Sequence, residues 1–270
     1  MEIWGGNRAV EDAISVHGID AWVYSRPYGG DEHGGDIHYV SMCGSGRIAR
    51  FAVADVSGHG RSVGELAVTL RSLMAKNVNR ADQTRFARAL NREFSALARD
   101  GTFATAILAT YWAPTDHLIT CNAGHPPPLW YRTEQRAWQP LVPDVPGHLE
   151  RAANLPLGII EPTDYHQFAV PLRKDDLILI YTDSLVEAKD PTGNQLGQAG
   201  LLELVSRLDA NQPGQFSRSL LDAVTDHRDG APADDDVTVL LLHHNAADPP
   251  FPSLGEMAKT TAKMLGLMKV

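Results

Sequence analysis

Cysteine is scarce in this chain of 270 residues, which contains only Cys43 and Cys121. The two form no Cys-x-x-Cys pair, so we expect no disulfide framework, and we expect reduced thiols in a reducing compartment. A cysteine nucleophile for phosphate esters would need an arginine six residues further on, but Ala49 and Pro127 occupy those positions. The sequence also contains no Gly-Lys dipeptide, which excludes the P-loop of nucleotide-binding proteins.

Positive charge and long apolar runs are lacking as well. The 24 Lys and Arg residues against 33 Asp and Glu give a formal net charge of -9, and no basic run could follow a nucleic-acid backbone. No apolar run reaches the length that spans a bilayer, and the first residues, MEIWGGNRAVEDA, lack the basic start and apolar core of a signal peptide. We therefore expect a cytoplasmic protein with no nucleic-acid partner and no integral membrane segment.

The remaining composition, with 43% hydrophobic and 21% charged residues, is that of an ordinary globular protein. Residues 1–17 are polar and are predicted to form an N-terminal lead-in. One domain is predicted over residues 18–244, because no linker or internal repeat divides them. The stretch NAADPPFPS marks the next boundary, and residues 245–270 are predicted to form a C-terminal tail.

The tail is predicted to contain a short amphipathic helix. Leu254, Met257 and Met264 recur at helical spacing, and Ser253 is a candidate cap. An isolated helix of this length is marginal in water, so its apolar stripe needs a surface to cover it. Docking onto the chain's own domain is the favoured interpretation, while a frayed tail and a helix that binds a partner or a membrane remain open. We expect the tail to be regulatory rather than catalytic.

Apolar periodicity changes several times along the chain. Alternating or continuous apolar runs predict strands at 21–25, 47–55, 102–112, 117–123, 128–132, 175–183 and 234–244. Helical spacing of apolar residues predicts helices at 62–78, 84–100, 198–208 and 214–227. Two helices between strands, then a run of strands, then two more helices and a last strand are typical of mixed α/β layers.

Three aspartates lie at the ends of predicted strands. Asp55 and Asp183 end two apolar runs, and Asp235 opens a third. A single aspartate in such a place is more often a cap or a turn residue. Three of them, gathered at one sheet edge, would repel one another unless a cation neutralised them, and hard oxygen ligands suit Mg²⁺ or Mn²⁺. The pattern therefore favours a divalent-metal site.

The motifs around these aspartates resemble a known family. VADVSGHG, NAGHPPPL, LPLGI, YTDSLVEA and DDVTVLLL follow one another in the order and rough spacing of the PPM-type (type 2C-like) metal-dependent Ser/Thr protein phosphatases. The resemblance covers about residues 18–243 and is closest to the bacterial branch typified by sporulation stage II protein E and the regulators of alternative sigma factors. GGDIHYV, at 34–40, is similar to the upstream acidic motif of that branch.

The resemblance implies an α+β fold, an αββα four-layer sandwich of two antiparallel sheets flanked by helices. It also implies two Mn²⁺ or Mg²⁺ ions at one end of the sheets. By position, Asp55 would bridge the ions, the carbonyl of Val56 would bind one of them, and Asp183 and Asp235 would complete the shell. Asp36 would be an additional ligand or would orient metal-bound water. Glycines after Asp55 would let the backbone pass close to the metals.

The activity that the resemblance implies is hydrolysis of phosphoserine and phosphothreonine by a metal-bridging hydroxide. The implied substrate is a phosphorylated regulatory protein, such as an anti-sigma-factor antagonist. We expect control by a partner or by formation of a homodimer, because the chain contains no recognisable sensor domain. Two alternatives remain: a pseudophosphatase that acts as a binding module, and a small-molecule phosphatase on the same fold.

Several other residues carry weaker expectations. His59 could protonate the leaving serine oxygen, although a role in stabilising its turn is favoured. His125 and Asn122 match the family, and we expect them to be structural. Arg26 could hold a phosphate group through two hydrogen bonds, although a lone arginine near a strand end more often points into solvent.

Two departures from the family pattern concern the metal site directly. Ser184 stands where the family usually has glycine after the YTD aspartate. If that position requires a positive φ, serine adds strain; alternatively, its hydroxyl could bond metal-bound water. The run Asp234, Asp235 and Asp236 leaves the third ligand open by one residue, and alignment on DDVT favours Asp235.

Overall fold

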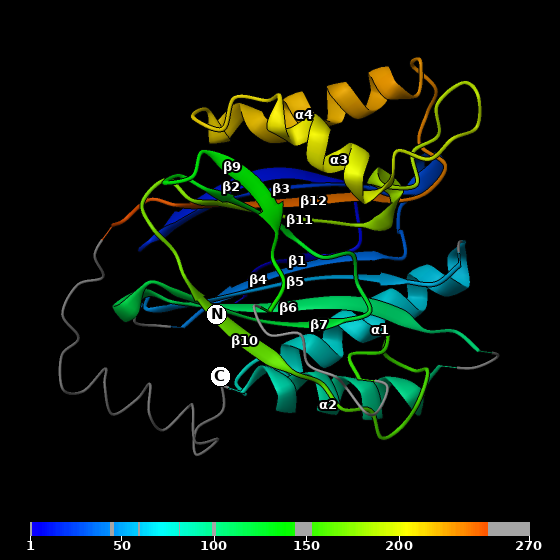
Figure 1. Cartoon of the computed structure of the whole chain (residues 1–270). Helices are drawn as coiled ribbons and strands as arrows, with labels where there is room; N and C mark the ends of the chain where they lie inside the picture. Colours follow the sequence, from blue (N-terminus) through cyan, green and yellow to red (C-terminus); the bar gives the residue numbers. More distant parts are fainter. Residues whose placement is uncertain are drawn as a thin grey trace.

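The computed structural model describes residues 2–43, 46–58, 60–80, 82–98, 101–143 and 153–247. In these ranges, two six-stranded antiparallel sheets pack face to face. Helices α1 and α2 cover the outer face of one sheet, and α3 and α4 cover the outer face of the other (Figure 1). The predicted α+β sandwich of four layers is therefore confirmed.

The first sheet has the order β1-β4-β5-β6-β7-β10. Its strands are β1 (Glu2–Gly6), β4 (Asp36–Met42), β5 (Ile48–Val56), β6 (Ala104–Trp112), β7 (His117–Ala123) and β10 (Gln167–Pro171). The helices against it are α1 (Arg61–Asn77) and α2 (Gln83–Ser95). Asp82 caps α2 by accepting a hydrogen bond from the backbone N–H of Arg85.

The second sheet has the order β2-β3-β12-β11-β8-β9. Its strands are β2 (Val10–Val16), β3 (Ile19–Arg26), β12 (Val237–His244), β11 (Leu177–Tyr181), β8 (Leu129–Arg132) and β9 (Ala137–Pro140). Helices α3 (Gly197–Ser206) and α4 (Pro213–His227) cover it. Short 3₁₀ turns, η1 (Tyr28–Gly30), η2 (Ala113–Thr115) and η3 (Asp183–Leu185), connect strands to loops.

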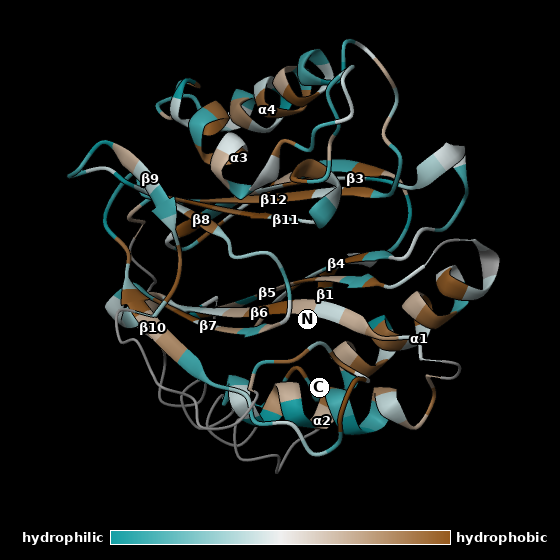
Figure 2. Cartoon of the chain, turned by 45° about the vertical axis from the view of Figure 1, so that its right-hand side comes forward, coloured by the Kyte–Doolittle hydropathy of each residue, from teal (hydrophilic) through white to brown (hydrophobic). Residues whose placement is uncertain are grey.

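Strand β5 explains how the apolar runs divide among the layers. Its side chains alternate between faces, so Phe51 and Val53 pack between the sheets while Ala52 and Ala54 pack against α1 and α2. A third apolar layer lies between the second sheet and α3 and α4. Both faces of the central strands are therefore buried, and these strands are hydrophobic along their length (Figure 2).

The N-terminal residues differ from the predicted lead-in. Residues 2–16 form β1, which pairs with β4, and β2, which pairs with β3. Both are edge strands, and the partly exposed, polar sequence of β2 hides the strand pattern that buried strands display. The chain crosses from one sheet to the other between β1 and β2. Asn7 lies at this crossing, where its side chain donates hydrogen bonds to the carbonyls of Gly34 (2.8 Å) and Gly64 (3.1 Å).

The predicted helix of the C-terminal tail lies outside the described residues, which end at 247, so it stays a prediction. Of the helices in the described ranges, none combines the length and the apolar character needed to cross a membrane.

Candidate metal centre

Neighbouring strands of the first sheet bring Asp36 and Asp55 together. Asp36 is the first residue of β4 and Asp55 the penultimate residue of β5, and the antiparallel register pairs them directly. Asp36 is buried and Asp55 is half-buried. Val56, the last residue of β5, donates its backbone N–H to the carbonyl of Gly35 (3.3 Å), which ties the two strand ends together.

The second sheet contributes the other acidic side chains at the same end. Asp183 begins η3 directly after β11, and Asp235 and Asp236 immediately precede β12. β11 and β12 are antiparallel neighbours, so the end of one lies beside the start of the other. The predicted site residues Asp36, Asp55, Val56, Asp183 and Asp235 therefore lie at one end of the sandwich.

The acidic side chains influence one another. The pKa of Asp55 is raised to about 7, mainly by burial and then by the charges of Asp183 and Asp235. Burial and the charges of Asp55 and Asp236 raise the pKa of Asp36 well above its ordinary range. Burial, Glu187 and Asp235 raise the pKa of Asp183. This end of the molecule therefore concentrates negative charge that a bound cation would neutralise.

The donor set fits a hard divalent cation, since it consists of carboxylate and carbonyl oxygens. In the described residues, however, no three acidic, histidine or cysteine side chains converge into a ready coordination shell. Like-charged carboxylates repel one another. Binding of a cation would therefore have to draw these side chains closer, and the assignment of individual ligands stays a prediction.

A hydroxyl network orients Asp36 across the two sheets. Thr182 Oγ1 donates a hydrogen bond to Asp36 Oδ2 (2.8 Å), and the backbone N–H of Thr238 donates to Thr182 Oγ1 (3.0 Å). The Thr238 hydroxyl in turn lies 2.9 Å from that of Ser25 on β3. All four side chains are buried. The position of Asp36 is thus fixed by Thr182, which follows β11 and is itself bonded to Thr238 on β12, a link that the sequence could not reveal.

Asp235 and Asp236 have different surroundings. The carboxylate of Asp236 is buried and accepts backbone N–H hydrogen bonds from Tyr28 (2.6 Å), Gly35 (2.5 Å) and Asp36 (3.3 Å). Asp235 is exposed. A carboxylate already surrounded by backbone donors has little capacity left for a metal, so this arrangement favours Asp235 as the ligand, in line with the alignment on DDVT.

The glycines of the Gly-Gly-Asp motif make this close packing possible. A Cβ at Gly34 would lie 2.5 Å from a carboxylate oxygen of Asp236, and a Cβ at Gly35 would lie 2.9 Å from the carbonyl oxygen of Val56. Side chains at these positions would therefore push apart the loop, Asp236 and the end of β5.

Ser184 does not have the strained conformation that the sequence left open. It lies in the 3₁₀ turn η3 and is not among the residues with positive φ, because the turn begins at Asp183 and continues in the helical region. Its side chain is buried, and its hydroxyl lies 3.4 Å from that of Thr182. Its carbonyl accepts a hydrogen bond from Arg228 Nη2 (2.8 Å).

The remaining predicted residues differ in their surroundings. Asn122 exchanges two hydrogen bonds with the backbone of His125, and His125 Nδ1 lies 2.8 Å from Thr105 Oγ1 on the residue opposite Asp55. Burial lowers the pKa of His125 to about 4, so its imidazole is neutral near pH 7. The structural role expected of it stays a prediction. His59 lies outside the described residues, so its role stays a prediction.

Comparison with solved structures identifies the class of fold. The structure of the RsbU and RsbW domains of Rv1364c from Mycobacterium tuberculosis aligns with a TM-score of 0.71 and 21% identity over 96% of this chain and 72% of that one. The PP2C phosphatase domain of SpoIIE from Bacillus subtilis, with a fragment of its regulatory domain, aligns with a TM-score of 0.70 and 19% identity over 87% of this chain and 70% of that one. The fold is therefore that of PP2C-type phosphatase domains.

The sequence itself defines the family. The profile described as stage II sporulation protein E (SpoIIE) matches residues 45–245, and the chain belongs to this family. Two curated relatives from Bacillus subtilis are each 25% identical to it: the phosphoserine phosphatase RsbP over 53% of this chain, and the phosphoserine phosphatase RsbU over 57%. The matches span only 33% of RsbP and 42% of RsbU. The resemblance inferred from the motifs is confirmed.

Proposed function

We propose that the chain is a metal-dependent phosphoprotein phosphatase that hydrolyses phosphoserine and phosphothreonine. The observation that carries the proposal is the cluster of carboxylates from both sheets at one end of the sandwich, with the pKa of Asp55 raised to about 7 by burial and by its acidic neighbours. Membership of the SpoIIE family and the names of RsbP and RsbU as phosphoserine phosphatases support it.

In this proposal the side chains of Asp55, Asp183 and Asp235 and the carbonyl of Val56 would hold two Mn²⁺ or Mg²⁺ ions. Bound divalent cations would neutralise the carboxylates and lower the pKa of water for attack on phosphorus. Asp36, fixed by Thr182, is either a further ligand or the acceptor that orients the attacking water.

In the reaction, the water oxygen forms a bond to phosphorus while the bond from phosphorus to the serine or threonine oxygen breaks. The leaving oxygen takes up a proton and inorganic phosphate is released. His59 is a candidate donor of that proton, and its alternative role is to stabilise the turn.

The proposed substrate is a small phosphorylated regulatory protein, such as an anti-sigma-factor antagonist. The similarity to RsbU, RsbP and SpoIIE supports this choice. We place the reaction in the cytoplasm, in keeping with Cys43 and Cys121, neither of which forms a disulfide within the described residues. A regulatory partner or a homodimer is the proposed means of control.

The test is hydrolysis of p-nitrophenyl phosphate and of a phosphoserine peptide by the purified full chain with Mn²⁺. Wild-type protein should hydrolyse both, and EDTA or the substitution Asp183→Asn should abolish turnover. Asp226→Asn, on the exposed surface of α4, is the matched control and should retain activity. A folded wild-type protein that binds phosphoprotein without turnover would instead be a pseudophosphatase, and strong preference for phosphometabolites would indicate a small-molecule phosphatase.

A further inference from the structure

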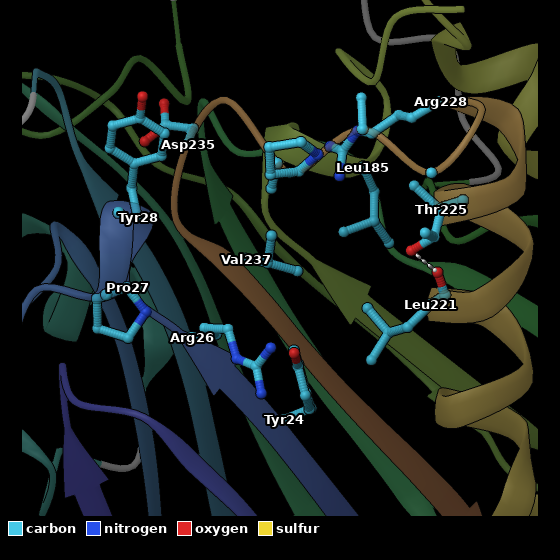
Figure 3. Close-up of a pocket in the computed structure, with 17 residues that line it drawn as sticks. Tyr24, Arg26, Pro27, Tyr28, Leu185, Leu221, Thr225, Arg228, Asp235 and Val237 are labelled. Carbon is cyan, nitrogen blue, oxygen red and sulfur yellow. Dashed lines mark hydrogen bonds between the residues drawn. The ribbon is translucent and has the colours of Figure 1, made fainter.

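A pocket of about 390 Å³ opens between the second sheet and α4 (Figure 3). It lies beside the acidic cluster, which consists of Asp36, Asp55, Asp183, Asp235 and Asp236. One wall comes from the end of β3 and from η1, another from the C-terminal half of α4 and the loop that follows it. Asp235 lies on its rim. The volume is in the range of pockets that bind small ligands or side chains, about 300–1,000 Å³. Whatever occupies this pocket lies next to a proposed metal ligand.

Two arginines line the pocket from different elements. Arg26 is the last residue of β3, and Arg228 directly follows α4 (Figure 3). Arg228 is half-buried and is held by its hydrogen bond to the carbonyl of Ser184 (2.8 Å). Arg26 is exposed, lies 5.7 Å from the ring centroid of Tyr24, and forms no ion pair with any residue that the structure describes. The pocket therefore presents one anchored guanidinium and one that is available to a ligand.

The pocket lining has two arginines against one carboxylate, that of Asp235, so its positive charge contrasts with its surroundings. The neighbouring end of the sandwich contains the carboxylates of Asp36, Asp55, Asp183 and Asp236, and the chain as a whole has a net charge of -9. Leu185, Val224 and Val237 form apolar walls around the arginines. Apolar walls strengthen a charge–charge interaction because they exclude water. An anionic group would thus be repelled by the acidic cluster and attracted into the pocket.

The pocket continues into a groove along α4. A second hollow, of about 740 Å³, shares Tyr24, Arg26, Leu221 and Thr225 with it and extends to β2. The charged residues that line this groove are of both signs: Glu11, Asp12 and Asp222, and Arg26 and Arg218. An extended peptide could follow the groove to the acidic cluster, and the selection for negative charge would be confined to the Arg26–Arg228 pocket.

We propose that the Arg26–Arg228 pocket binds the carboxylate of an acidic residue adjacent to the phosphorylated residue of a protein substrate. The inference rests on the proposed phosphatase function, because the location of Asp235 on the rim sets the pocket beside the reacting phosphoryl group. The two guanidinium groups supply charge-assisted hydrogen bonds to the carboxylate. The pocket thereby determines which phosphorylated sites the protein accepts.

The test compares two synthetic phosphoserine peptides that differ only in having Glu or Gln beside the phosphoserine. With the full chain and Mn²⁺, wild-type kcat/KM should be about tenfold higher for the Glu peptide. Arg26→Gln should bring the ratio close to one, and Arg26→Glu should reverse the preference in favour of a Lys peptide. Arg92→Gln, an exposed arginine on α2 in the opposite layer, is the matched control and should keep the wild-type ratio.

The outcomes separate the inference from the proposed function. The inference is overturned if wild type turns over the Glu and Gln peptides with nearly equal kcat/KM, or if Arg26→Gln keeps the wild-type ratio of the two values. Either result leaves the phosphatase function intact. A rise in KM for p-nitrophenyl phosphate equal to the rise for the Glu peptide in Arg26→Gln also overturns it, because Arg26 would then bind the reacting phosphoryl group.

A binding experiment decides the inference even if no turnover is found. In EDTA, an unphosphorylated Glu peptide should shift the Nε–Hε NMR signals of Arg26 and Arg228 in the ¹⁵N-labelled full chain, and the Gln peptide should not. The signals lost in Arg26→Gln and in Arg228→Gln assign the two arginines. Equal shifts with both peptides, or none with either, overturn the inference.

Discussion

Asp235 and Asp236 are adjacent in the sequence but have different neighbours in the fold. The backbone N–H groups of Tyr28 and Gly35 surround Asp236, whereas Asp235 faces solvent on the rim of the pocket. Removal of the Asp236 carboxylate should therefore destabilise the fold, whereas removal of the Asp235 carboxylate should impair hydrolysis.

We expect Asp236→Ala to lower the free energy of unfolding by about 2–5 kcal/mol, because buried backbone donors lose their acceptor at a cost of about 1–3 kcal/mol each. Asp235→Ala should abolish Mn²⁺-dependent hydrolysis without loss of stability in EDTA, since it removes a like charge near Asp55. Urea denaturation and p-nitrophenyl phosphate hydrolysis measure the two effects. Asp236→Asn keeps an acceptor oxygen, so its free energy of unfolding should fall between those of Asp236→Ala and Asp235→Ala. Equal destabilisation by both alanine variants would contradict the assignment of Asp236 to folding and Asp235 to metal binding.

Ser184 allows a second test at this scale. Because the residue lies in a 3₁₀ turn without positive φ, Ser184→Gly should lower stability by about 0.5–1 kcal/mol through the greater freedom of the unfolded chain. Ser184→Ala controls for the loss of the hydroxyl and should be the more stable of the two variants. The denaturation midpoint is the measurement, and a midpoint raised by glycine would restore the idea of a strained turn.

At the scale of elements, the pairing of β4 with β5 places Asp36 opposite Asp55, and the loop before β4 supports Val56. The close approach of Gly35 to the Val56 carbonyl makes the spacing of these two strand ends sensitive to a single methyl group.

We expect Gly35→Ala to lower the affinity for Mn²⁺ at least tenfold. Its Cβ would lie 2.9 Å from the Val56 carbonyl oxygen and 3.0 Å from Val63 Cγ1, so β5 or α1 must move. Gly6→Ala is the matched control, because its nearest neighbour would be a side-chain atom of His38 at 3.7 Å. Titration of Mn²⁺ against hydrolysis rate measures the affinity, and equal affinities in the two variants would exclude this packing argument.

The sequence predicted the central elements well because their apolar content and period are unambiguous. Strands such as β5 and β11 are buried on both faces, and Asp55 and Asp183 could be recognised as lying at or just beyond the ends of these strands. The edge strand β2 was missed because its exposed residues resemble a polar loop. The contacts of Arg228 with Ser184, and of Asp236 with Gly35, join segments 44 and 201 residues apart, and no local pattern encodes such contacts.

At the scale of the whole molecule, the acidic end and the buried histidines give opposite contributions to pH dependence. Burial lowers the pKa of His38 and of His125 to about 4, so their contribution to stability is present above their ordinary pKa of 6.5 and is lost as pH falls. The pKa of Asp55 is raised from 3.8 to about 7, so its contribution is lost as pH rises through 7.

We therefore expect wild-type protein in EDTA to lose stability relative to Asp55→Asn as the pH rises from about 4 to 7, because unfolded Asp55 is ionised there while folded Asp55 still holds its proton. The histidine contributions are the same in both proteins and cancel in this difference. Mn²⁺ should reverse this slope, because it neutralises the ionised carboxylates. Urea denaturation of both proteins across this range measures the difference in their free energies of unfolding. A difference that does not fall with pH in EDTA would show that the acidic cluster is not under mutual repulsion.

Hydrogen bonds from one sheet to the other determine where the two sheets can separate. At the acidic end of the sandwich, Asp36 accepts from Thr182 and Asp236 accepts from the backbone N–H of Gly35, while Asn7 anchors the chain crossing beside them. Separation of the sheets at this end would first have to break these buried hydrogen bonds, which protect the region from local opening. Thermal fluctuations that loosen the sandwich are thus expected to start away from the acidic end. The strand ends that carry the carboxylates keep their mutual positions while other parts of the molecule fluctuate.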